Sequence, residues 1–189
     1  MQWNIPGTVI PVDLNQDPHI EDRIKGMFLG GGMMLGQITA VTGLEPYTVQ
    51  NWVKRGFLKA PENKRYTLRQ LCRIININML KDVLVMEDIC GLLQYINGNL
   101  GDESDDLIDD SQLYFLFLRL AVCHARTHTP FESDEYLDAV LQEYQEPIPG
   151  AKERVKKVLR IMLTAWAAAQ LKQKAQNWLL CLKESKEKE

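Results

Sequence analysis

Apolar residues recur at helical spacing along most of the chain, and glycine, proline and acidic clusters separate the helical segments. In the first half, two short helices are predicted over residues 35–42 and 46–55. Gly43 stands between them, where the end of a helix favours a left-handed residue. Longer helices are predicted over residues 68–79 and 89–96, because large apolar residues repeat there every three or four positions. This series predicts a small helical unit.

The second half of the chain keeps the same period. Residues 111–127 are apolar almost all round, which predicts a buried helix. A shorter helix over 132–144 and a long helix over 151–182 follow, the last with an apolar stripe along one side. At the other end, residues 1–17 predict an extended arm and residues 18–28 a short helix.

A short β hairpin is predicted over residues 57–66, because Ala60–Asn63 has the composition of a turn and brief extended pieces flank it. The predicted fold class is therefore all-α with a small β wing. Gly30–Gly32 is interpreted as a flexible joint, since no lysine followed by serine or threonine makes it a phosphate-binding loop. Four parts are predicted: an arm with a short helix (1–34), a helical unit carrying the wing (35–100), an acidic linker (101–110) and a C-terminal helical domain (111–189).

The formal net charge of −3 conceals charge blocks of opposite sign. Residues 35–81 hold eight basic residues against two acidic ones, whereas residues 82–146 hold fifteen acidic residues against two basic ones. A basic block on a small helical unit is typical of a surface that binds nucleic acid. A solvated basic surface without a ligand is the alternative. A further hypothesis is that residues 102–110 fold back on the basic block and compete with DNA.

The helix predicted over residues 46–55 has two unlike faces at about 100° per residue. Its apolar arc consists of Val49, Trp52 and Val53. The opposite arc consists of Tyr47, Thr48, Asn51, Lys54 and Arg55, with Gln50 at its border. Amide side chains can pair bidentately with adenine, so Gln50 and Asn51 are predicted to contact bases in the major groove, beside Tyr47 and Thr48. The groups predicted to contact phosphates are Lys54, Arg55, Lys59, Lys64 and Arg65.

Four short motifs resemble the MerR-type winged helix-turn-helix and follow the order of that family. They are ITAVTGL at 38–44, TVQNW at 48–52, GFLK at 56–59 and RYT at 65–67. In that family a two-helix DNA-binding motif is followed by a wing that closes on a basic residue and a tyrosine, and then by two helices. The resemblance implies that residues 35–100 form a DNA-binding domain and that Tyr66 also holds the DNA backbone.

Residues 49–57, 63–66 and 77–80 more closely resemble an uncharacterised bacterial family of unknown function that has this MerR-like module. MerR proteins carry Arg-Tyr-Tyr where this chain has Gln50-Asn51-Trp52, so their base preference is not carried over. Lys64 stands where the wing arginine is usual, which keeps the charge and loses the bidentate fork. MerR regulators continue into a long dimerising helix with an effector site. Here an acidic stretch and three predicted helices follow, and the effector is unknown.

The sequence predicts a protein that acts without catalysis. No histidine, cysteine or serine stands in a recognisable nucleophile motif. His124 and His128 have a spacing that can chelate metal, but no second ligand cluster accompanies them, so neither a metal nor a cofactor is predicted. No apolar run is long enough for a membrane span, and the first residues lack the features of a secretory signal. A cytoplasmic location is therefore expected.

The predicted function is a transcriptional regulator that binds double-stranded DNA. The apolar stripe of the helix over 151–182 is expected to pack on the helix over 111–127. Its rival use is a homodimer contact through the C-terminal helices, which would suit palindromic half-sites. The alternative function is a protein-binding adaptor that uses the face with Tyr47 and Trp52 for a partner. Salt distinguishes the two functions, because binding to DNA weakens steeply as salt rises.

Overall fold

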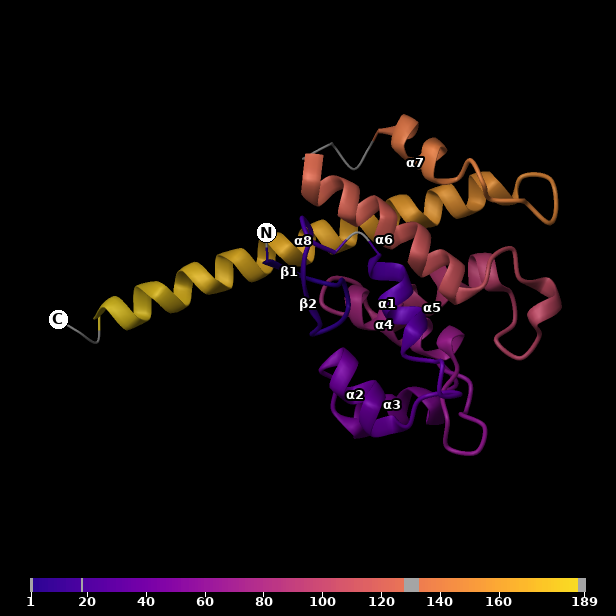
Figure 1. The fold of residues 1–189 in the computed structure, drawn as a ribbon, viewed down its shortest axis with the longest axis horizontal. Coiled ribbons are helices and arrows are strands. Elements are labelled where there is room, and N and C mark those ends of the chain that lie inside the picture. The colour runs from indigo at the N-terminus through magenta and orange to yellow at the C-terminus, as the bar shows by residue number, and fades with distance from the viewer. Residues whose placement is uncertain (1, 18, 128–132, 187–189) are drawn as a thin grey trace.

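The computed structural model describes residues 2–17, 19–127 and 133–186 of the chain. These residues form a helical protein with one small sheet (Figure 1). The strands are β1 (Gln2–Asn4) and β2 (Pro11–Asp13). The helices are α1 (Ile20–Gly26), α2 (Leu35–Thr42), α3 (Pro46–Lys54), α4 (Leu68–Leu80), α5 (Met86–Asn97), the 3₁₀ turn η1 (Glu103–Asp105), α6 (Asp110–Thr127), α7 (Asp134–Val140) and α8 (Ala151–Lys186).

Helix α4 lies at the centre of the fold and packs against α2, α5, α6 and α8. Thr67 begins it with a capping box: the Thr67 hydroxyl accepts from the Gln70 amide at 3.2 Å, and the Gln70 side chain accepts from the Thr67 amide at 2.9 Å. The residues from Leu71 to Ile77 are all buried. Because α4 is covered on every side, it connects the first half of the chain to the second.

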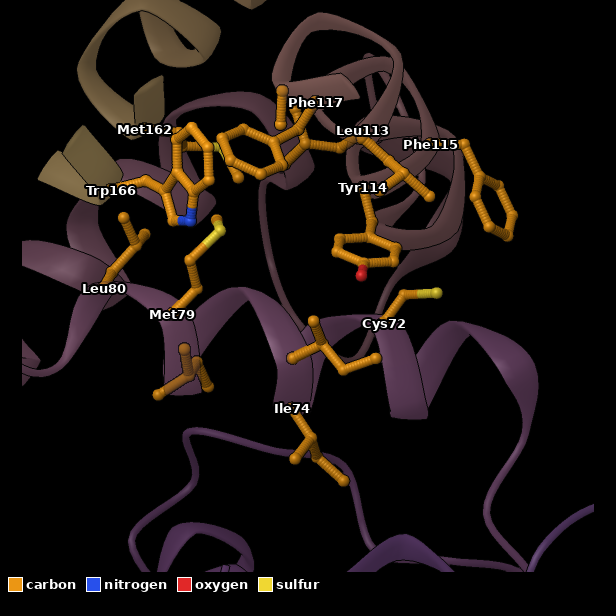
Figure 2. Close-up of a cluster of buried hydrophobic side chains, with 14 of the residues drawn as sticks. Cys72, Ile74, Met79, Leu80, Leu113, Tyr114, Phe115, Phe117, Met162 and Trp166 are labelled. Atoms are coloured by element: carbon orange, nitrogen blue, oxygen red, sulfur yellow. The ribbon is translucent and has the colours of Figure 1, made fainter. Parts of the chain in front are cut away.

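Aromatic and sulfur-containing side chains fill the space between α4, α6 and α8 (Figure 2). Trp166 of α8 meets Phe117 of α6 edge-on, with 5.9 Å between ring centroids. Met79 of α4 lies beside them. The buried apolar residues form one cluster that extends from Ile5 to Trp166. The predicted division into a helical unit and a separate C-terminal domain therefore does not correspond to two cores.

The predicted extended arm is part of this core and holds the sheet. Strands β1 and β2 pair antiparallel, with Trp3 opposite Val12. Ile5 is buried, and the Tyr114 hydroxyl donates to the Pro6 carbonyl at 2.9 Å. In the predicted wing over residues 57–66, by contrast, the structure has isolated bridges and no strand. The predicted fold class includes a small β element. The structure has one, but it lies within residues 2–13 and not within residues 57–66.

Residues 101–110, predicted as an acidic linker, fold against the helices. Leu107 and Ile108 are buried. The Leu107 amide donates to the Ile96 carbonyl at 2.7 Å, and the Tyr144 hydroxyl donates to the Leu107 carbonyl at 2.6 Å. The segment thus joins α5 to α6 as a packed connection instead of a solvated tether.

The acidic residues of this segment pair with cations of α4. The Arg73 guanidinium lies 3.3 Å from the buried carboxylate of Asp110, and Arg69 contacts both Asp106 and, at 3.3 Å, Glu103. Burial raises the pKa of Asp110, an effect that Arg73 and Arg69 oppose. The acidic segment therefore folds against part of the basic block, pairing with Arg69 and Arg73 of α4 and with Lys59. Whether it competes with DNA stays a hypothesis.

Gly43 provides a test of the local geometry between α2 and α3. It ends α2 with φ +69°, and a Cβ there would stand 2.6 Å from Val9 Cγ1. Gly43→Ala is expected to lower the free energy of unfolding by about 1–2 kcal/mol, because an L-residue is strained at this φ. Urea denaturation measures it. Gly36→Ala, within α2 and facing open space, is the control and should stabilise by up to about 1 kcal/mol. Equal effects at both sites would contradict the prediction.

Helix α8 is much longer than the others and extends past the rest of the fold as a single helix (Figure 1). Its first part packs on α5, α6 and α7, where Val155, Leu159 and Met162 are buried. From Gln170 to Leu182 its side chains are exposed. Among the described residues, no helix is both long and apolar enough to cross a bilayer.

Candidate nucleic-acid interface

Helices α2 and α3 form the pair of short helices that the sequence predicts, joined at Gly43–Glu45. Pro46 occupies the first turn of α3, where its missing N–H costs no hydrogen bond. Val49 and Trp52 are buried and fix the apolar side of α3 in the core, with Ile38 of α2 also buried. The orientation of α3 is therefore set by packing.

The other side of α3 faces outward. Tyr47 is 64% exposed, and Gln50, Asn51 and Lys54 are also exposed. Thr48 is half-buried, and its backbone amide donates to the Glu45 carbonyl at 2.9 Å. The structure thus brings the predicted base-contacting residues onto one exposed helix face.

A tight turn projects beside α3, at the place of the predicted wing. Asn63 and Lys64 both have positive φ, 49° and 62°, and the Arg65 amide donates to the Glu62 carbonyl at 2.8 Å. Two consecutive positive φ values are typical of the type I′ turn that closes a two-residue hairpin. The turn comes later in the chain than the predicted Ala60–Asn63, and it exposes the Lys64 side chain at its tip.

Arg65 ties this turn to the triple glycine. Its Nη1 lies 3.2 Å from the Gly31 carbonyl oxygen and 3.1 Å from that of Gly32. A Cβ on Gly32 would stand 3.1 Å from the Arg65 Cβ, so glycine permits this close approach. The segment predicted as a flexible joint is therefore held by the residue that follows this turn. Arg65 combines its charge with a structural role.

Tyr66 is a core residue in the structure. It is 3% exposed, and its backbone pairs with Met33 through two hydrogen bonds of 2.7 and 2.9 Å. Burial raises the pKa of its hydroxyl. The implied contact between Tyr66 and a DNA backbone therefore has no exposed side chain to make it. In the structure Tyr66 joins the Asn63–Lys64 turn to Met33.

The remaining cationic side chains differ in their contacts with acidic and aromatic neighbours. Arg55 lies 4.6 Å from the centroid of the Phe57 ring and 3.6 Å from a Glu87 carboxylate oxygen. Lys59 Nζ is 3.9 Å from Glu103. Lys54 and Lys64 form no ion pair with any described residue. These two lysines therefore offer the charges most accessible to an anionic partner.

Residues 34–117 match the model of a family described as "Domain of unknown function (DUF1836)". The uncharacterized protein YkrK of Bacillus subtilis (strain 168) is 31% identical over 84 residues, which cover 42% of this chain and 36% of YkrK. The chain thus matches about a third of that relative's length. No solved structure matches the chain. The matches support an uncharacterised bacterial family.

The region similar to DUF1836 begins at the N-cap of α2 and ends inside α6. It contains α3, the Asn63–Lys64 turn and the acidic segment 102–110, and it crosses the boundary predicted at 100–110. This extent agrees with the packing of α4 on α6 across that segment. The exposed face of α3 and the ion pairs behind it therefore belong to one matched region.

A groove next to α3 was not predicted from the sequence. It encloses about 580 Å³ between the start of α2, the side of α3 and the turn. Its lining is mostly apolar and consists of Met34, Leu35, Gly36, Gln50, Val53, Lys54, Pro61, Lys64 and Tyr66. Met34 and Leu35 lie more than ten residues before α3 in the sequence, so only the folded chain brings them beside Val53.

No metal-ligand cluster of three or more His, Cys, Asp or Glu residues occurs in the part of the chain that the structure describes. Of the two histidines with a chelating spacing, His128 lies outside the described residues. The ring of His124 lies edge-on to Trp166, with 6.4 Å between centroids.

Proposed function

We propose that the protein binds double-stranded DNA through α3 and the Asn63–Lys64 turn, as a MerR-like winged helix-turn-helix regulator. One observation carries the proposal: packing of Val49 and Trp52 holds α3 so that Gln50, Asn51 and Lys54 face outward beside the Lys64 turn. A helix fits the major groove. When packing already fixes the helix, its amide side chains can meet base edges without a further loss of backbone conformational entropy.

In this proposal, Gln50 and Asn51 contact bases, with Tyr47 and Thr48 beside them. Phosphate contacts come from the cations around the helix: Lys54, Arg55, Lys59, Lys64 and Arg65. Arg69 and Arg73 are excluded from this set, because acidic residues 103–110 neutralise them inside the fold. The proposed function needs no catalysis. A regulator that binds DNA in a bacterial cell acts in the cytoplasm.

Salt dependence tests the proposal. If five cations displace counterions, the slope of log affinity against log salt is about −4.5, and affinity falls about 500-fold between roughly 50 and 200 mM salt. Lys54→Ala with Lys64→Ala should weaken binding and reduce the magnitude of the slope by about 2. Fluorescence anisotropy with a random-sequence duplex pool measures both quantities. Arg65 is left in place because it holds Gly31 and Gly32.

The matched control removes two exposed or half-exposed lysines from the start of α8, Lys152→Ala with Lys157→Ala. Figure 1 shows this part of α8 on the opposite side of the fold from α3. The control changes the net charge by the same amount, so its affinity and slope should stay close to those of the wild type. Equal losses in both double variants would indicate a general charge effect and contradict the proposed interface.

The apolar groove beside α3 favours a second candidate, a protein-binding adaptor. Its lining of Met34, Leu35, Val53 and Pro61 suits an apolar side chain of a partner, with Lys54 and Lys64 at its rim. Such a contact would respond weakly to salt. No binding to duplex DNA at low salt would favour the adaptor over the DNA-binding function.

A further inference from the structure

The exposed part of α8 carries a regular strip. Seven positions alternate at spacings of three and four residues, and all seven are exposed: Ile161, Thr164, Ala168, Leu171, Ala175, Trp178 and Leu182. At about 100° per residue they lie within an arc of about 100°. A repeat of 3.5 residues is the period of helices that pair lengthwise. The exposed strip therefore has the pattern of a coiled-coil seam.

The strip begins on the body of the protein and continues past it. Around Ile161, the opposite side of α8 is buried through Val158, Met162 and Trp166. Further along, α8 extends past the rest of the fold (Figure 1), and Leu171 and Trp178 are 69% and 63% exposed. In proteins most helical stability comes from tertiary packing of an apolar face, and the exposed part of α8 has little such packing. The apolar strip marks the side on which a contact would stabilise it.

We propose that this strip pairs with the same strip of a second copy of the chain, in antiparallel orientation. Large and small side chains are placed along it so that an antiparallel copy complements most of them. In one register three of the four large residues face a small one: Leu171 faces Ala175 of the second copy, Trp178 faces Ala168, and Leu182 faces Thr164. A parallel pair would place Trp178 on Trp178 and Ala175 on Ala175, which leaves uneven gaps.

The apolar surface available is sufficient for a specific pair. The large side chains on the strip and at its edge are 44–69% exposed: Ile161, Leu171, Trp178, Leu179 and Leu182. At roughly 100 Å² each they offer on the order of 500 Å² per copy and 1,000 Å² per pair, which reaches the lower limit expected of a biological interface.

Two lysines flank the middle of the strip. Lys172 Nζ donates to the Asp82 carbonyl at 3.1 Å, and Lys174 Nζ lies 5.2 Å from the centroid of the Trp178 ring. An antiparallel copy brings the same lysines close to one another, so added salt should screen their repulsion and strengthen the pair. This response is opposite in sign to the salt response expected for DNA binding.

Sedimentation equilibrium without DNA tests the pairing, so its result is independent of the proposed function. Leu171→Lys places a charge on the strip, and Leu180→Lys is its matched control, because Leu180 is 57% exposed and lies nine residues along α8, on the opposite side of the helix. We expect wild type and Leu180→Lys to dimerise at about 10 μM and Leu171→Lys to dimerise at least about 50-fold more weakly. Circular dichroism verifies that all three fold.

Two outcomes would overturn the proposal: a wild-type chain that stays monomeric at about 100 μM, or equal effects of the two lysine substitutions. Orientation is tested in a Cys181→Ser background. Chains with Leu171→Cys and chains with Ala175→Cys should form a mixed disulfide when combined. A disulfide between two Leu171→Cys chains in preference to the mixed one would indicate parallel pairing and overturn the antiparallel arrangement.

Discussion

Replacing Asp110 with asparagine is expected to lower the free energy of unfolding by about 3–5 kcal/mol. The Asp110 carboxylate is 1% exposed and lies 3.3 Å from the Arg73 guanidinium and 3.8 Å from that of Arg69. The neutral amide leaves Arg73 buried without an anion, and a buried charge without a partner is among the costliest defects in a protein. Urea denaturation of the wild type and the variant measures the loss.

Glu135→Gln in α7 is the control. It also removes one negative charge, and the exposed Glu135 forms no ion pair with any described residue. Its effect should stay within about 0.5 kcal/mol. A loss below about 1 kcal/mol for Asp110→Asn would mean that this pair contributes little and that the other contacts of the acidic segment hold it in place.

Trp166→Ala is expected to destabilise the protein by about 3–5 kcal/mol, because it removes the largest side chain between α8 and the rest of the core. Among the described residues, the Trp166 ring meets those of Phe117, Trp3 and His124 edge-on, at centroid distances of 5.9, 6.3 and 6.4 Å. Such edge contacts add to the area that the ring buries. Thermal and urea unfolding measure the change.

Trp166→Phe separates the ring contacts from the loss of volume. It keeps an aromatic ring in the space and should cost clearly less than alanine, on the order of 1–2 kcal/mol. If phenylalanine and alanine destabilise equally, the indole shape is required, and the cavity explanation for the alanine variant would be wrong.

Most helices could be predicted because the residues that begin and end each helix stand next to it in the sequence. Helix α2 has the predicted bounds, 35–42, and α4 begins at Leu68 as predicted. Gly43 ends the first with a left-handed φ, and Thr67 begins the second with its capping box. The outward face of α3 could also be predicted, because helical period alone places Gln50 and Asn51 opposite Val49 and Trp52.

The features that could not be predicted depend on residues far apart in the chain. Strands β1 and β2 are three residues long, too short to show alternation. The run of acids after Gly101 has the composition of a hydrated linker, and only the fold shows that Arg73 stands opposite Asp110, 37 residues away. Tyr66 follows a cationic turn and was predicted to hold the DNA backbone, but its side chain is buried and its backbone pairs with that of Met33, far earlier in the chain.

The contact between Trp3 and Trp166 sets a condition on how the chain folds. Their ring centroids are 6.3 Å apart, although 162 residues separate them in the sequence. A ribosome adds about 5–20 residues per second, so Trp166 of α8 is synthesised on the order of 10–30 seconds after β1. During that time Trp3 and Ile5 are apolar groups without their final neighbours. We infer that the arm docks in a late step of folding, after α4 and α6 have met.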